Sequence, residues 1–144
     1  MSSRKQLEAE ILASIRRVIA ASILFNHEVA ERVGLGASDG QFMTLLELHG
    51  PLTPGHLAEL SGLTTGTVTG VIDRLERAGF VRRDRAPDDR RKVIVSPNPD
   101  QIGQTMDPHY TEQAQHLTGL LGHYNATELA VIADFLNRLG NAQP

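Results

Sequence analysis

The sequence predicts an α+β fold that is mainly α-helical, with one small β hairpin near its middle. Apolar residues recur at spacings of three and four along most of the 144-residue chain, which is the period of amphipathic helices. Between about residues 80 and 96, short strand-like runs with a turn between them replace this period. Aromatic residues make up 4% of the chain and Trp is absent, so we expect a core of Leu, Ile, Val and Ala, which suits helices.

Apolar spacing and capping residues predict the first two helices. A long amphipathic helix begins near residue 3 and ends near residue 32, before a pair of glycines. Its apolar stripe consists of Leu7, Ile11, Ile15, Val18, Ile19 and Phe25. In the second helix Ser38 stands three residues before Gln41, which is a capping-box spacing, and Gly50 closes the helix.

Residues 53–78 predict a helix-turn-helix. Thr53 followed by Pro54 is typical of an N-cap and a first helical residue, and Gly62 ends this short helix. Thr64 caps the following helix, which continues to Ala78. Two short helices joined by a tight turn form the arrangement that places a helix in a DNA major groove.

A basic segment overlaps the end of this second helix and continues into the hairpin. Its two strands, over residues 80–85 and 92–96, are joined by a turn rich in Pro and Asp. Residues 74–92 hold eight of the 14 Lys and Arg residues and four acids, so they carry +4 (eight minus four), whereas the whole chain carries −3. A basic patch on an acidic protein is expected of a surface that binds phosphates.

The helix predicted over residues 64–78 has an apolar face, expected in the core, and an open face, expected on DNA. The open face consists of Gly66, Gly70, Asp73 and Arg77, flanked by Thr67, Thr69 and Arg74. Each glycine on an exposed helix face destabilises the helix by about 1 kcal/mol relative to Ala. Close approach of a DNA groove wall would explain why both positions lack a side chain. The alternative is that glycine is simply tolerated on this surface. The hydroxyls suited to phosphates or base edges belong to Thr64, Thr65, Thr67 and Thr69. Capping is their alternative role, which Thr64 alone would fill.

The hairpin turn places Arg90 and Arg91 where a guanidinium can enter a minor groove. Asp89 lies two residues before Arg91 and can accept its hydrogen bonds, which would hold that side chain in one orientation. The strand that faces the DNA backbone would be lined by Arg82, Arg83 and Arg85. The alternative is a solvated charge run, which the net positive charge and the preceding helix-turn-helix disfavour.

These residues together carry a family resemblance. The chain resembles the MarR family of transcription regulators in the run PLTPGHLAELSGLTTGTVTGVIDRLERAGF (residues 51–80) and in PDDRR at residues 87–91. It departs from the family at Gly70, where many relatives have Arg. It also departs at residues 95–99, where VSPNP replaces the usual Leu-Thr-x-x-Gly after the second wing strand.

The resemblance implies an obligate dimer of winged helix-turn-helix subunits, with a dimerisation region made by both chain ends. It implies that Asp89 and Arg91 match the family's wing Asp-x-Arg and that residues 64–74 match its recognition helix. We therefore expect one compact domain overall. Its expected parts are a DNA-binding module at 36–98, with a recognition helix at about 64–78 and a wing at about 80–96, and a dimerisation region at 1–35 and 100–144.

Both chain ends carry apolar stripes that one short domain cannot easily bury. Toward the C-terminus a near-heptad stripe consists of Met106, Tyr110, Leu117, Leu121 and Tyr124. A final helix follows, with Asn125 and Glu128 at capping-box spacing. Burial against a second copy is the economical solution, since two-fold dimers are the commonest oligomers. The alternative is that the ends fold back on their own core.

The composition also excludes several classes of protein. The chain has no Cys, which removes disulfides, thiolate nucleophiles and thiolate metal sites. Charged residues interrupt the N-terminal region, so we expect no signal peptide, no membrane span and a cytoplasmic protein. There is no nucleophile–base pattern and no phosphate-binding glycine loop, so we expect a non-enzyme without a cofactor.

His109, His116 and His123 recur at seven-residue intervals and are expected on one helix face. Seven residues rise about 10.5 Å along a helix, too far for two of them to share one metal ion. We therefore expect no metal site. These histidines would flank the dimer seam or face a ligand cavity.

The sequence thus predicts a homodimer that binds a double-stranded, pseudo-palindromic operator and represses transcription. The resemblance implies that a small aromatic or phenolic effector releases it. The expected effector site consists of Phe25, His27, Phe42, Leu46 and Tyr110, although ordinary interhelical packing explains each of them equally well. The alternatives are a winged-helix protein-interaction module, which predicts a neutral or acidic recognition face, and a metal-responsive regulator.

Overall fold

The computed structural model describes residues 1–142, which form two compact units. The first unit is Met1–Met106 and the second begins at Asp107. The expectation of one compact domain is therefore wrong. The reason is that the residues of the buried core all lie in the first unit, whereas the two long helices of the second unit have no buried residue.

The first unit opens with the long helix α1 (Arg4–Arg32), as predicted. Ser3 caps it, because its hydroxyl accepts the backbone N–H of Gln6 while the Gln6 side chain accepts the N–H of Ser3. The helix α2 (Ala37–His49) follows after a short turn.

The predicted cap of α2 at Ser38 is wrong. Gly36 is the N-cap residue, and Asp39 at the third helical position reaches back so that its Oδ2 accepts the Gly36 N–H at 3.2 Å. The carboxylate of Asp39 thus makes one half of a capping box, whereas the other half is missing because Gly36 has no side chain to accept an N–H, and Ser38 lies inside the first turn.

The helix-turn-helix is confirmed. It consists of α3 (Pro54–Ser61) and α4 (Thr65–Arg77). The hydroxyls of Thr53 and Thr64 cap the two helices, each accepting a backbone N–H from three residues ahead. Between the helices Gly62 takes a left-handed conformation (φ +71°), which a residue with a side chain rarely adopts.

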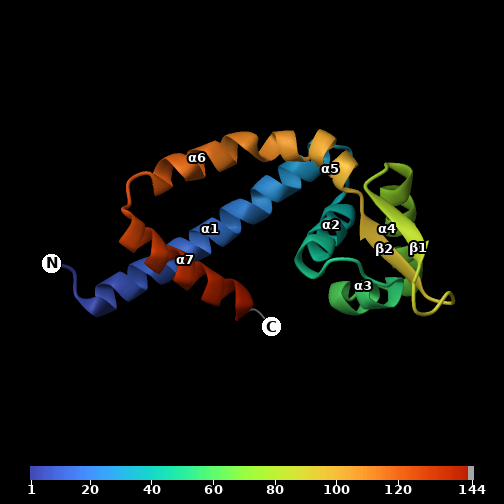
Figure 1. The fold of residues 1–144 in the computed structure, drawn as a ribbon, viewed down its shortest axis with the longest axis horizontal. Helices are drawn as coiled ribbons and strands as arrows, with labels where there is room; N and C mark the ends of the chain where they lie inside the picture. Colours follow the sequence, from blue (N-terminus) through green and yellow to red (C-terminus); the bar gives the residue numbers. More distant parts are fainter. Residues whose placement is uncertain (143–144) are drawn as a thin grey trace. The chain divides into compact units, whose positions relative to one another are not determined.

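The hairpin consists of β1 (Val81–Arg85) and β2 (Val93–Pro97), an antiparallel pair that begins one residue later than predicted on each strand. Leu52, which precedes α3, pairs with Val95 through two backbone hydrogen bonds of 3.0 and 2.8 Å. The middle of β2 is thereby tied to the segment that leads into α3, and Figure 1 shows α2, α3 and α4 grouped with the two strands. The largest fully buried side chains are Val29, Phe42, Leu46, Leu57, Val68, Val71, Ile72, Leu75, Phe80 and Val95.

After the hairpin the chain forms α5 (Pro99–Thr105), which ends the first unit. The second unit contains the 3₁₀ helix η1 (Asp107–Tyr110), α6 (Thr111–Leu121) and α7 (Ala126–Asn141). The predicted capping box of Asn125 and Glu128 is confirmed, with hydrogen bonds of 2.9 and 2.8 Å. Within residues 1–142 no helix combines the length and apolar character needed to cross a membrane.

The three histidines do not share one helix, so their predicted row is wrong. His109 belongs to η1, His116 to α6, and His123 lies beyond Gly122, the C-cap of α6. Two residues explain the break: Pro108 lacks the N–H that a continuous helix needs, and Gly122 ends α6.

Candidate nucleic-acid interface

The open face of α4 lies where the sequence placed it. Val68, Val71 and Leu75 are buried on the opposite side of the helix, so the face with Gly66 points away from the core. A Cβ atom added at Gly66 would meet nothing within 4 Å. The exposed side of α4 is therefore unobstructed at Gly66.

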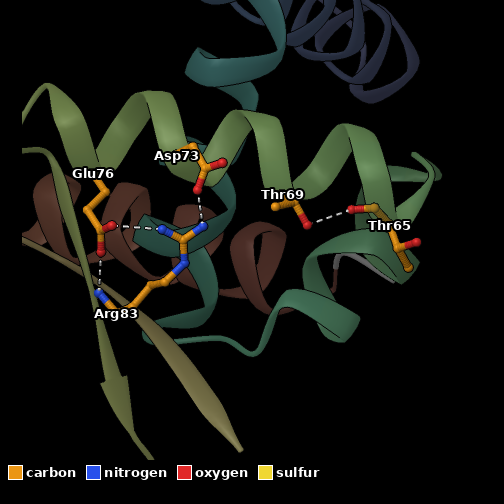
Figure 2. A network of polar contacts seen from close by, with 5 residues as sticks. All are labelled: Thr65, Thr69, Asp73, Glu76 and Arg83. Atoms are coloured by element: carbon orange, nitrogen blue, oxygen red, sulfur yellow. Dashed lines mark hydrogen bonds and ion pairs between the residues drawn. The ribbon is translucent and has the colours of Figure 1, made fainter.

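The threonines at the start of α4 divide into bonded and available hydroxyls. The Thr64 hydroxyl is the cap and also contacts the Thr67 hydroxyl at 2.9 Å. The Thr69 hydroxyl donates to the backbone oxygen of Thr65 at 3.0 Å (Figure 2). Within the described chain the Thr65 hydroxyl makes no hydrogen bond, so it is the available hydroxyl of the first turn.

Arg83 of β1 binds two carboxylates of α4 (Figure 2). Its guanidinium pairs with Asp73 and, at 2.7 Å, with Glu76, while its backbone N–H donates to Glu76 at 3.1 Å. The hydrogen bond to Asp73, with weaker help from Glu76, raises the pKa of Arg83 above its usual value. These bonds tie the wing to the recognition helix.

The expectation that Arg83 lines the DNA-facing side of β1 with Arg82 and Arg85 is therefore wrong. Successive side chains of a strand point to opposite faces, so Arg83 faces α4 while its neighbour Arg82 is exposed. The Arg83 side chain is only 28% exposed. Asp73 and Glu76 were not singled out as partners, although their i, i+3 spacing on one helix places both on one side.

Arg74 also has a partner inside the protein. Its guanidinium binds Asp39 of α2, with the shortest N–O distance 2.9 Å. This hydrogen bond, together with the charge of Asp39, raises the pKa of Arg74 above its usual value. The sequence offered one signal for Asp39, its position three residues after Gly36, which indicates a helix start and not a partner for α4.

The wing tip is ordered by Asp89. Its Oδ1 accepts the backbone N–H of Arg91 at 3.0 Å and the Arg91 Nε at 3.4 Å, so the predicted contact is confirmed. The Arg91 side chain nevertheless stays 93% exposed. Arg85 donates to the backbone oxygen of Arg90 at 3.4 Å across the turn.

The exposed cations between the end of α4 and the end of the wing turn are mostly without an ion-pair partner inside the described residues. Arg82 has an acidic neighbour, Asp84, at 3.0 Å. The cations with no ion pair inside the described residues are Arg77, Arg85, Arg90 and Lys92. Positive charge therefore extends from the end of α4 to the wing tip, as a phosphate-binding surface requires.

Other candidate residues lie in different surroundings. Phe42 and Leu46 are fully buried in the core of the first unit, where packing already explains them. His27 pairs with Glu31 on the exposed side of α1 at 3.1 Å. Tyr110 belongs to η1 of the second unit. The predicted effector site remains a prediction.

The structure also has a shallow surface hollow that sequence reasoning missed. It is lined by Thr53, Pro54, Gly55, His56, Glu59, Lys92 and Val93. The described residues contain no cluster of three His, Asp or Glu side chains that could hold a metal ion.

Two short helices, an exposed helix face and a basic hairpin tied to that helix define a winged helix-turn-helix protein of the DNA-binding class. The sequence model of the MarR family matches residues 38–93, which cover α2 to the start of β2. Residues 38–93 therefore form a domain of the MarR family of transcription regulators. Regulators of this family are non-enzymatic, which confirms the expectation of a non-enzyme.

Three similar proteins place the match in context. An uncharacterised HTH-type transcriptional regulator of Bacillus subtilis, YcgE, is 38% identical over 96 residues, covering 67% of this chain and 62% of that protein. The B. subtilis HTH-type transcriptional repressor YetL is 39% identical over 66 residues, covering 43% of this chain and 40% of YetL. A MarR family protein of Bacillus stearothermophilus shares the fold, with a TM-score of 0.63, 23% identity and 97% coverage of both chains. The chain thus spans about three fifths or less of the curated relatives' lengths.

Proposed function

We propose that this chain is a transcription regulator that binds operator DNA with α4 in a major groove and the wing in an adjacent minor groove. The observation that carries the proposal is the joint placement of the two DNA-facing parts. The open face of α4 and the exposed Arg91 belong to elements that Arg83 ties together. A rigid pair of this kind suits simultaneous contact with two grooves.

Homodimer formation is part of the proposal, with residues 1–35 and 100–144 as the dimerisation region. The terminal helices expose many large apolar side chains, which a second copy would cover. On α1 they are Leu7, Ile11, Leu12, Val18, Ile19, Ile23 and Leu24; on α6 and α7 they are Leu117, Leu120, Leu121, Val131, Phe135 and Leu136.

A two-fold dimer binds a two-fold site, so the proposed operator is a pseudo-palindrome with half-sites about 10 bp apart. The name of YetL as a repressor supports repression as the direction of control. The most detailed part of the proposal is that a small aromatic effector releases the protein from its operator. By linkage, such an effector lowers operator affinity only as far as it prefers the DNA-incompetent state of the protein.

The experiment is selection of bound duplexes from a random pool, followed by fluorescence anisotropy with the selected sequence. We expect a palindromic consensus and an affinity that falls steeply and log-linearly with salt, because several arginines displace counterions. Recovery of no consensus, or an affinity independent of salt, contradicts DNA recognition. Titration of the complex with salicylate and other small aromatic acids tests the effector separately.

A further inference from the structure

Asp39 is the only charged residue among those described that is buried, with 5% of its surface exposed. It lies in the first turn of α2, where the helix dipole favours a negative charge. Burial of a carboxylate is costly unless hydrogen bonds replace its water, so each of its oxygen contacts has a large effect.

The two oxygens of Asp39 join the start of α2 to α4. Oδ2 accepts the N–H of Gly36 at 3.2 Å, which fixes the start of α2. Oδ1 accepts the Arg74 Nη2 at 2.9 Å and the Arg74 Nε at 3.2 Å, a forked contact that only a guanidinium makes. Beside this site α1 and α2 are in close contact, since a Cβ at Gly40 would lie 3.2 Å from the Cβ of Ala30.

The recognition helix is therefore held by charged contacts to two different elements. Arg74 binds α2 through Asp39, and its neighbour Asp73 binds the wing through Arg83. The apolar contacts of α4 with the core are not directional, so by themselves they constrain its rotation less than directional bonds do. The forked ion pairs are directional and fix the rotation of α4 about its axis.

We propose that Asp39 is a positioning residue for DNA recognition, which acts through Arg74 to fix the orientation of α4 against the α1–α2 junction. This inference rests on the proposed DNA-binding function. It assigns Arg74 to this contact and not to phosphate binding, the role that the sequence suggested.

The two roles of Arg74 predict opposite signs for one substitution. Asp39→Asn removes a negative charge and frees Arg74, so electrostatics alone would strengthen DNA binding. If Asp39 positions α4, the same substitution weakens binding. Asn is nearly the same size and its side-chain oxygen can still accept the Gly36 N–H, so the cap of α2 is kept.

The experiment uses the full chain, the selected operator and five variants: Asp39→Asn, Arg74→Gln, Arg74→Lys, the double variant Asp39→Asn/Arg74→Gln, and Arg77→Gln. We expect Asp39→Asn and Arg74→Gln each to raise the operator Kd about tenfold and the double variant to be no weaker than either single one, since contacting residues couple. Arg74→Lys keeps the charge but loses the fork, so it should weaken binding as well. Arg77→Gln removes one positive charge from the DNA-facing side of α4 without touching Asp39, so it gives the loss expected of an arginine that only binds phosphate.

A second readout does not depend on DNA. In the free protein the paired Nε–H of Arg74 should give a separate, slowly exchanging nitrogen–proton resonance that Asp39→Asn abolishes. Circular dichroism melting identifies any variant that fails to fold. If Asp39→Asn does not fold, Arg74→Lys carries the test, because its substitution lies at the exposed end of the pair.

Three outcomes overturn the inference while leaving DNA binding intact: an Asp39→Asn affinity equal to or higher than wild type, a wild-type affinity for Arg74→Lys, or strictly additive losses in the double variant. Failure of the wild-type chain to bind any selected duplex is a different result. It overturns the proposed function, and the inference falls with it.

Discussion

The winged module and the terminal helices use apolar residues in opposite ways. In the module, Phe42, Leu57 and Val71 are completely buried, and the helices and hairpin close a core without outside help. On α6 and α7 no residue is buried, and side chains such as Val131 and Leu136 are mostly exposed. The difference shows that the module closes its core within a single chain, whereas α6 and α7 leave apolar side chains exposed, which is the observation behind the proposed dimer.

The largest expected effect tests the closed core. Phe42→Ala should lower the free energy of unfolding by about 3–5 kcal/mol, since a large cavity replaces a fully packed ring. Urea denaturation of the wild type and the variant gives this difference. A loss below about 1 kcal/mol would mean that the core of the module is loosely packed, and its contrast with the terminal helices would not hold.

The second prediction breaks the exposed region. Phe135→Ser together with Leu136→Ser on α7 should raise the dimer dissociation constant at least tenfold, since truncation of an interface hot spot costs about 2 kcal/mol or more. Sedimentation velocity over a concentration series measures this shift. Glu112→Gln, an exposed change on α6, is the control. If the variant destabilised the module but still formed the dimer, the α7 side chains would belong to the core of the module and not to the proposed dimer interface.

The third prediction concerns the wing tip. Arg91→Ala should weaken operator binding about tenfold, since one arginine contact contributes about 1–3 kcal/mol. Its melting temperature should stay within about 2 °C of wild type, because a side chain that is 93% exposed has little packing to lose. Anisotropy and calorimetry measure the two quantities, with Arg138→Ala on α7 as a charge-matched control. A large drop in melting temperature would make Arg91 a structural residue.

The smallest effect should come from Gly66. Gly66→Ala should stabilise the free protein by up to about 1 kcal/mol, because Ala favours helix and the added Cβ has open space. Operator affinity should fall nonetheless, because that open space is where the groove wall would come close. Unchanged affinity in the stabilised variant would show that this glycine is merely tolerated.

Local signals in the sequence predicted most local features, although the cap of α2 is Gly36 and not Ser38. The caps at Thr53 and Thr64, the turn at Gly62 and the hairpin all depend on neighbouring residues, and the structure has them within a residue. Apolar periodicity likewise identified the buried face of α4.

The ion pairs between elements, which sequence reasoning missed, join distant segments. Asp39 and Arg74 lie 35 residues apart, and Arg83 finds its partners ten and seven residues back, on another element. A charge in a basic run gives no sign of which carboxylate it meets, because that depends on how strands and helices pack. The sequence therefore predicted a uniform basic surface, whereas Arg74 and Arg83 instead fix the recognition helix.

The pairing of Leu52 with Val95 determines which part of the wing can open locally. Val95 is fully buried and its amide is bonded to Leu52, so its hydrogen exchange requires opening of the whole module. At the tip, Asp88 and Arg90 are exposed and should exchange within the dead time of a labelling experiment. The conformational entropy lost on binding a groove then comes mainly from exposed side chains at the tip such as Arg91, because the strands are already ordered in the free protein.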